Sequence, residues 1–306
     1  MSNEYELIVI GGGPAGLTAG LYASRARLST LLVERGIMGG LITNAELVEN
    51  YPGFPQGISG LELGQLMHQQ AVKYGLETIT AEATGVELDK AIKTIHTDQG
   101  AYQAMAVIIA GGSELKKLGV PGEDRLIGRG VSYCATCDGA FFREKTVAVV
   151  GGGDAAITEA LHLTKFTSRV VVIHRRDQLR ASKIVEEKAF AEPKMDFLWD
   201  SVVEEINGDM VVEELKIRHV RTGESSSLKV DGVFIYVGIK PNTEYLKGIL
   251  KLDESGHILV NELRETELSG VFAAGDVCHN SSRQVIAAAG DGATAALSAE
   301  RFIREV

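Results

Sequence analysis

The sequence predicts an α/β fold with two domains. A glycine-rich turn occurs twice, at residues 11–16 and 151–156, and each copy lies between a short apolar run and a segment of helical pattern. The length of 306 residues also suits two domains of ordinary size. A strand, a glycine turn and a helix in this order are typical of Rossmann-like domains, three-layer ββα structures that bind nucleotides.

The first repeat predicts a complete βαβ unit. Residues 7–10 form an unbroken apolar run that indicates a buried strand, 17–26 indicate a helix, and 30–34 indicate a second strand. The turn and helix start, formed by Gly11, Gly13, Pro14, Ala15 and Gly16, would hold a pyrophosphate against free backbone N–H groups. Glu34 ends the second strand, where an acid binds ribose hydroxyls, so a plain glycine turn is the weaker interpretation.

The second repeat has the opposite charge at its strand tip. Residues 147–150, 157–166 and 170–173 predict strand, helix and strand around Gly153 and Ala155. The second strand ends in Arg175 and Arg176, with Arg180 beyond, and has no acid there. Guanidinium groups fit a 2′-phosphate, so this site predicts NADPH in preference to NADH. The alternative is a solvated run of charge.

The remaining elements are predicted from shorter patterns. Residues 61–74 have helical spacing, 104–109 form a buried strand, and 271–274 form a late strand before Gly275 and Asp276. From 197 to 237 the pattern is β-like with polar turns, and the Ala-rich segment 284–303 is helical.

Between the two repeats lies a CxxC motif, Cys134 to Cys137, with Asp138 directly after it. Such cysteines can close into a disulfide that accepts two electrons, and an adjacent acid can move the protons. The Glu34 site suits FAD or NAD, and a flavin there would relay a hydride from NADPH to the disulfide. Cys278 stands alone and is interpreted as a buried residue.

Composition excludes several classes of function. The net charge of −10 argues against binding to nucleic acid or to anionic membranes. No apolar run is long enough to span a bilayer, and the first residues lack signal-peptide character, so the expected location is the cytoplasm. With three cysteines there is neither a disulfide framework nor a second ligand pair for zinc, and no metal is predicted.

The chain resembles the low-molecular-weight bacterial-type thioredoxin reductases over essentially its whole length. Besides the two glycine turns, the resemblance rests on segments 49–54, 130–139, 174–180, 238–243, 270–277 and 283–284. It implies FAD in a domain of residues 1–115 and 246–306, and NADPH in an inserted domain, 116–245, that carries the CxxC. It also implies a homodimer, and a thioredoxin or thioredoxin-like protein as the partner.

The resemblance further assigns individual residues. For FAD it adds Gly39, Gly40, Leu41, Asn50, Asp276, Arg283, Gln284 and Val285, and for NADPH it adds Asp154 and His174. Cys134 would be the interchange thiol and Cys137 the thiol that faces the flavin. Three positions depart from the family pattern on the FAD side, namely Leu41 for a glutamine, Gly111 for a threonine and Ser282 for an aromatic residue.

Other functions remain open at this point. The acceptor could be another thioredoxin-like or glutaredoxin-like protein, or a peroxidase-coupled carrier. A non-enzymatic flavin redox sensor would bind flavin without turnover, and a zinc-bound structural protein would contain stoichiometric metal without the yellow colour of a flavin.

Overall fold

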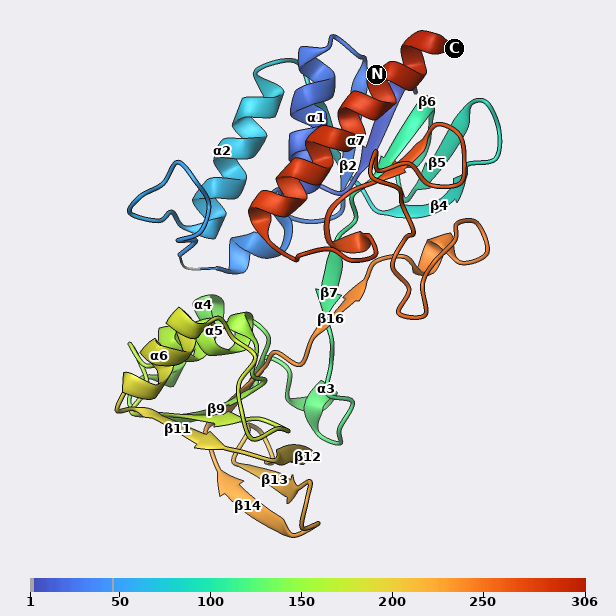
Figure 1. Ribbon diagram of the computed structural model, residues 1–306. Helices are drawn as coiled ribbons and strands as arrows, with labels where there is room; N and C mark the ends of the chain where they lie inside the picture. Colours follow the sequence, from blue (N-terminus) through green and yellow to red (C-terminus); the bar gives the residue numbers. More distant parts are fainter. Residues whose placement is uncertain (1–2, 46) are drawn as a thin grey trace. The chain divides into compact units, whose positions relative to one another are not determined.

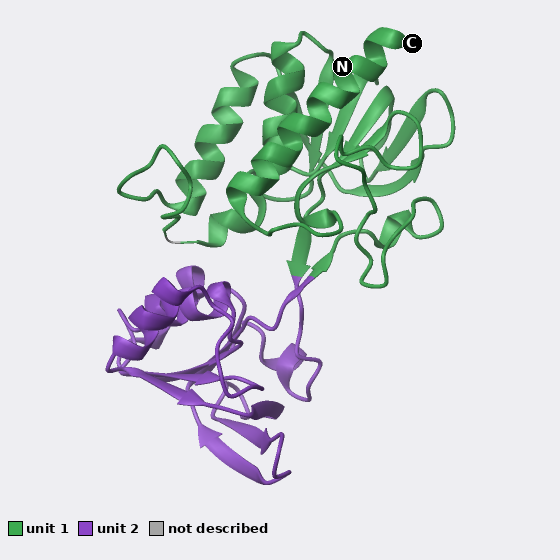
Figure 2. Cartoon of the chain, in the orientation of Figure 1, with its two compact units in different colours: residues 1–114, 240–306 green, residues 115–239 purple. Residues whose placement is uncertain are grey.

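The computed structural model describes residues 3–45 and 47–306. The chain divides into two compact units, one of residues 1–114 with 240–306 and the other of residues 115–239 (Figure 2). The second unit is therefore inserted between the two segments of the first. The chain passes from one unit to the other at β7 (Ser113–Leu115) and β16 (Ile239–Pro241), which pair as a two-stranded sheet.

Unit 1 is built on a seven-stranded sheet of order β3-β2-β1-β6-β5-β4, with β17 also paired to β6 (Figure 1). The strands are β1 (Glu4–Ile10), β2 (Thr30–Glu34), β3 (Glu77–Thr80), β4 (Ala83–Glu87), β5 (Lys93–Thr97), β6 (Gly100–Ile109) and β17 (Val271–Ala273). Pairing is parallel among β3, β2, β1, β6 and β17, whereas β4 and β5 are antiparallel. The parallel strands are buried on both faces, which is why the sequence shows apolar runs there rather than alternation.

Two cores lie on the two faces of this sheet. On one face α1 (Pro14–Arg25) and α7 (Val285–Glu305) bury alanine-rich stripes against Leu7 and Val9, and α2 (Gly60–Val72) adds Ala71 to this core. On the other face Ile8 and Ile10 pack with residues of β4, β5 and the segment after β16. The small side chains of α1 and α7 let these helices approach closely, and they lie side by side in Figure 1.

Unit 2 has a parallel five-stranded sheet of order β11-β10-β9-β15-β8. Its strands are β8 (Val131–Ser132), β9 (Thr146–Val150), β10 (Arg169–Ile173), β11 (Met195–Leu198) and β15 (Gly232–Ile235). One face is covered by α4 (Ala135–Asp138), α5 (Asp154–Leu163) and α6 (Lys183–Ala191). The other face packs on an antiparallel sheet of β12 (Ser201–Asn207), β13 (Glu214–His219) and β14 (Ser225–Lys229). A short helix, α3 (Glu123–Leu126), precedes β8.

The boundaries of the two compact units differ by a few residues from the predicted domain limits. The sequence interpretation ended the inserted domain at residue 245, whereas residues 240–245 pack in unit 1. Asn242 Nδ2 donates to the Gly111 carbonyl at 2.8 Å, and Thr243 Oγ1 donates to the Gly256 carbonyl at 2.6 Å. Tyr245 packs against the core that contains Leu246. These contacts are non-local, so the sequence pattern does not reveal them.

Among the described residues, no helix combines the length and the apolar character needed to cross a bilayer.

Candidate active site

The first glycine turn has the shape of a nucleotide cradle. A Cβ on Gly16 would lie 1.8 Å from the Gly11 carbonyl oxygen, so the helix and the turn can pack this closely only because residue 16 is a glycine. At Gly13, by contrast, a Cβ would meet nothing within 4 Å, so this backbone faces open space. Helix α1 starts after Gly13 without a side-chain cap, which leaves its first N–H groups for an anion. This turn fits the pyrophosphate of FAD.

Glu34 and the glycines after β2 close around the same turn. The Glu34 carboxylate accepts the Gly12 N–H at 2.6 Å and the Gly36 N–H at 2.7 Å. Gly39 N donates to the Gly12 carbonyl at 2.8 Å, and a Cβ on Gly40 would lie 3.1 Å from the Gly13 Cα. The acid at the tip of β2 thus lies beside the turn, where a ribose would follow the pyrophosphate.

The last part of the chain completes this site from far away in sequence. A Cβ on Gly275 would lie 2.9 Å from the Ala15 Cβ, and one on Gly292 would lie 2.0 Å from the Ala15 carbonyl oxygen. These contacts place Asp276 near the start of α1. Burial raises the pKa of the Asp276 carboxyl, while a hydrogen bond from Ser281 Oγ at 3.1 Å opposes the shift.

Of the other predicted FAD residues, some make contacts within unit 1 and others are exposed. Asn50 Nδ2 donates to Gln284 Oε1 at 2.9 Å, so two predicted residues meet across 234 positions of sequence. Val285 packs on the small core of Val48, Ile58 and Leu63. Leu41 and Arg283 are exposed, and in the described part of the chain no hydrogen bond or ion pair joins either side chain to the first turn.

The second glycine turn is built in the same way in unit 2. A Cβ on Gly151 would lie 2.5 Å from the Tyr236 carbonyl oxygen, whereas one on Gly153 would meet nothing within 4 Å. Helix α5 starts after Gly153 without a side-chain cap. The His174 ring closes over the turn, since a Cβ on Gly152 would lie 2.5 Å from its Cε1 and Nδ1. This cradle fits a second dinucleotide.

The charged residues at the β10 tip surround that turn. Arg180 N donates to the Gly152 carbonyl at 2.7 Å, which ties the arginine segment to the cradle. The side chains of Arg175, Arg176 and Arg180 are exposed, and within residues 3–45 and 47–306 no carboxylate forms an ion pair with any of them. Burial lowers the pKa of His174, which is 5% exposed, and the three guanidinium charges act in the same direction.

Asp154 has a structural contact of its own. Its Oδ1 accepts the N–H of Ser182, the N-cap residue of α6, at 2.8 Å. Asp154 thereby joins the first turn of α5 to the start of α6 next to the arginine segment. Ala155 follows it in the first turn of the helix that leaves Gly153.

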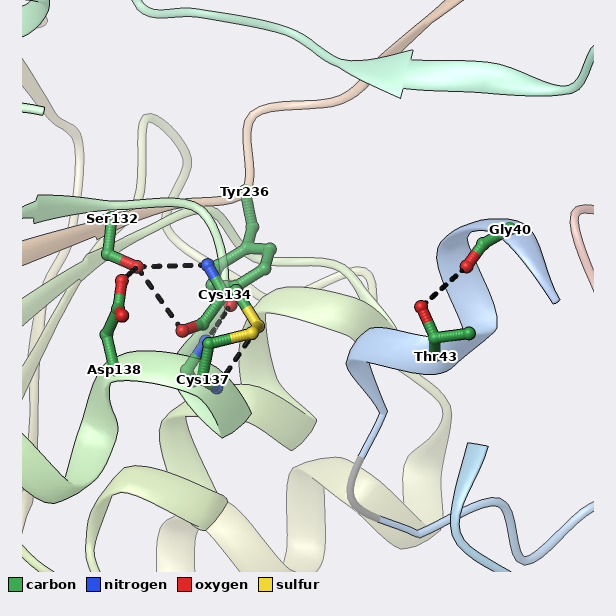
Figure 3. Close-up of a disulfide and its surroundings, with 8 residues drawn as sticks. Gly40, Thr43, Ser132, Cys134, Cys137, Asp138 and Tyr236 are labelled. Atoms are coloured by element: carbon green, nitrogen blue, oxygen red, sulfur yellow. Dashed lines mark hydrogen bonds between the residues drawn. A yellow bond between two sulfur atoms is a disulfide. The ribbon is translucent and has the colours of Figure 1, made fainter. Parts of the chain in front are cut away.

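The cysteines form a disulfide on a helical turn, α4, with Cα atoms 5.3 Å apart (Figure 3). Cys134 is the N-cap residue, and its Sγ accepts the Cys137 N–H at 3.1 Å. Ser132 Oγ donates to Asp138 Oδ2 at 2.6 Å and accepts the Cys134 N–H at 3.0 Å. The acid next to the motif is therefore partly buried and held by Ser132, which also contacts the backbone of Cys134.

Two residues of this site were missed by sequence reasoning. Ser132 orients Asp138, and the Tyr236 hydroxyl accepts the Ala135 N–H at 2.9 Å. Ser132 lies only two residues before the motif and could have been found as a polar residue beside it. Tyr236 lies 101 positions away from Ala135, and no local signal points to it.

Cys278 and the possible metal ligands lie apart from this chemistry. Cys278 is fully buried (0% exposed), and burial raises its pKa to about 12, so its thiol is unreactive at neutral pH. In the described ranges, no group of three or more His, Cys, Asp or Glu side chains is arranged to hold a metal ion.

Comparisons with known proteins agree with this geometry. The chain is 48% identical over 309 residues to the thioredoxin reductase of Bacillus subtilis (strain 168), which covers 100% of this chain and 98% of that protein. It is 46% identical to the bifunctional thioredoxin reductase/thioredoxin of Mycobacterium leprae (strain TN), over 98% of this chain and 66% of that protein. Its fold matches the crystal structure of Lactococcus lactis thioredoxin reductase with a TM-score of 0.97 at 43% identity, over 99% and 100% of the two chains.

These similarities confirm the predicted α/β fold with two Rossmann-like nucleotide-binding domains, and they support FAD and NADPH as the cofactors. The model of the pyridine nucleotide-disulphide oxidoreductases matches residues 5–292. The chain belongs to the pyridine nucleotide-disulphide oxidoreductase family.

Proposed function

We propose that this protein is an NADPH-dependent thioredoxin-disulfide reductase. The observation that carries the proposal is the Cys134–Cys137 disulfide on the unit that also holds the arginine-lined nucleotide turn. The relatives named above support thioredoxin as the acceptor, because one of them joins a thioredoxin reductase and a thioredoxin in its name. Unit 1 is the FAD domain in this proposal, and unit 2 is the NADPH domain.

The cofactors and the protein divide the work. When bound, NADPH supplies a hydride and FAD supplies a two-electron relay to a disulfide. In unit 1 the turn at Gly11–Gly16, Glu34 and Asp276 would hold FAD, and in unit 2 the turn at Gly153, with the three arginines, would hold NADPH. The open backbone at Gly13 and Gly153 leaves room for both pyrophosphates.

The cysteines and Asp138 carry out the disulfide chemistry. Reduction of the Cys134–Cys137 bond consumes two electrons and two protons and yields two thiols. Asp138, held by Ser132, would carry a proton to or from a cysteine Sγ. The Cys134 thiolate, favoured by the Cys137 N–H, then attacks the disulfide of the partner and releases one partner thiolate. Cys137 attacks Cys134 Sγ, restores the internal disulfide and releases the second partner thiolate.

An anaerobic titration tests the complete proposal. NADPH is expected to bleach the flavin absorbance at stoichiometric amounts, and added oxidised thioredoxin is expected to restore it, because the thiols pass their electrons to the partner. Bleaching without recovery would contradict thioredoxin as the acceptor and would point to another acceptor or to a sensor. An absence of bleaching would redirect the search to another electron donor, such as a ferredoxin.

We also propose that the protein is a homodimer through unit 1. A cavity of about 270 Å³ opens where α1, α2 and α7 meet, and it is lined mostly by apolar or small side chains, among them Leu21, Tyr22, Met67 and Ala293. Exposed apolar residues of the same helices, such as Leu66 and Leu297, extend this surface. Sedimentation velocity is expected to give twice the chain mass of 32.8 kDa, and a monomer at micromolar concentration would contradict the proposal.

A further inference from the structure

Tyr236 lies where the two functional turns of unit 2 meet. It follows β15 directly, and its N–H donates to the Val150 carbonyl at 2.8 Å. Its own carbonyl is in contact with the nucleotide turn, because a Cβ on Gly151 would lie 2.5 Å from that oxygen. Its side-chain hydroxyl accepts the Ala135 N–H of the redox turn at 2.9 Å (Figure 3). One residue therefore contacts both turns.

The hydrogen bond to Ala135 matters because of where that N–H lies. Ala135 is the first residue of α4, directly after the N-cap residue Cys134, and it is fully buried (0% exposed). A buried N–H without an acceptor is costly, so the hydroxyl of Tyr236 stabilises this orientation of the turn. The same orientation places the Cys137 N–H 3.1 Å from Cys134 Sγ.

The surroundings keep this hydroxyl neutral. Burial raises the pKa of Tyr236 well above its usual value, and the charges of Glu159 and Asp138 act in the same direction. The phenol therefore keeps its proton while a lone pair accepts the Ala135 N–H. Ser132 on β8 holds the turn through the Cys134 N–H, so this side chain and that of Tyr236, directly after β15, fix successive N–H groups of the redox turn.

We propose that Tyr236 is a positioning residue for the Cys134–Cys137 pair, which its hydroxyl holds in place beside the nucleotide turn. The proposal rests on the redox role proposed above for these cysteines. In the oxidised protein the S–S bond itself keeps the two cysteines together. The structure shows the Tyr236 contact with the S–S bond closed, and in the reduced protein that bond is absent and the turn is freer to relax. Both restraints order the same turn and therefore favour each other, so loss of the hydroxyl should destabilise the oxidised form more than the reduced form.

The test is Tyr236→Phe, which removes the hydroxyl and keeps the ring. The full-length holoenzyme is equilibrated with reduced and oxidised dithiothreitol, quenched and alkylated, and the peptide that contains Cys134 and Cys137 is quantified by mass spectrometry. The equilibrium constant for reduction is expected to rise about 3- to 10-fold, the effect of one hydrogen bond. This increase raises the reduction potential of the cysteine pair by up to about 30 mV. Hydrogen exchange at the Ala135 amide is expected to accelerate by at least the same factor.

Tyr133→Phe is the matched control. Tyr133 precedes Cys134, but its hydroxyl donates to Glu123 Oε1 at 2.6 Å rather than to the redox turn. In the variant, the Glu123 carboxylate still accepts the N–H groups of Leu118 and Gly119. The dithiothreitol equilibrium of this control should stay within about twofold of the wild type. Calorimetry with NADP⁺ should give dissociation constants within about twofold of the wild type for both variants, because the backbone contact at Gly151 is unchanged.

Three outcomes would overturn the role of Tyr236. These are an unchanged equilibrium and amide exchange in Tyr236→Phe, an equal shift in Tyr133→Phe, or a parallel loss of NADP⁺ affinity in Tyr236→Phe. Failure of the proposed function looks different. In that case the wild-type disulfide would equilibrate with dithiothreitol, yet the protein would not reduce thioredoxin.

Discussion

Cys137→Ser is expected to lower NADPH-dependent thioredoxin reduction by more than about a thousandfold, as removal of a residue that forms a covalent intermediate does. Serine cannot close the bond to Cys134 Sγ, so the protein can neither store two electrons as a dithiol nor release the mixed disulfide. Turnover is measured as NADPH oxidation coupled to thioredoxin and insulin reduction. The variant should still bind FAD and still show bleaching of the flavin by NADPH, because both nucleotide turns are unchanged.

Cys278→Ala is the matched control for this prediction. Its thiol is buried and protonated at neutral pH, and it takes no part in the mechanism. The control protein should keep at least about half of the wild-type turnover once its FAD content is accounted for. If Cys137→Ser retained full thioredoxin reduction, or if Cys278→Ala lost it with FAD bound, the assignment of the redox pair would be wrong.

The double variant Arg175→Ala/Arg176→Ala is expected to bind NADPH about 100-fold more weakly, while its affinity for NADH stays within about twofold. Each guanidinium would make a charge-assisted hydrogen bond to the 2′-phosphate, and both are exposed without a competing carboxylate among the described residues. NADH lacks that phosphate, so its affinity should not respond to the two substitutions. The measurement is the KM for each nucleotide, with the dissociation constants of NADP⁺ and NAD⁺ by calorimetry.

Arg169→Ala controls for the loss of charge. Arg169 lies at the opposite end of β10 and pairs with Asp196 at 2.6 Å. Its replacement by alanine therefore removes one positive charge from the same strand but away from the turn. Its NADPH affinity should change by less than about twofold. Equal losses for NADPH and NADH in the double variant would show damage to the turn rather than loss of phosphate recognition.

Local patterns were sufficient for the two βαβ units. The apolar runs at residues 7–10 and 147–150 became β1 and β9, and the helices predicted after the glycine turns became α1 and α5, within a few residues at each end. Such runs are readable because parallel strands are buried on both faces and tolerate few polar residues. The arginines at the tip of β10 were also placed correctly, because strand and turn are adjacent in the chain.

Some secondary-structure elements were not predicted, because their local sequence patterns are weak. Helix α6 was not predicted, and the CxxC was not recognised as a helical turn, although α4 spans Ala135–Asp138. An element of four residues leaves no helical period to detect. The antiparallel pair of β4 and β5 was missed as well, since its short strands are only partly buried and show little alternation.

The sequence by itself determined the chemistry of this protein, namely two nucleotide turns, an acid at one strand tip, arginines at the other, and a pair of cysteines between them. These features are encoded by neighbouring residues, and the resemblance to a family follows from them. Only the tertiary structure decided how they are supported. It brings Gly275 and Gly292 against Ala15, Gln284 to Asn50, and the hydroxyl of Tyr236 to Ala135. The physical reason is that these contacts join residues far apart in the chain, and their partners are set by sheet order and helix packing rather than by any local pattern.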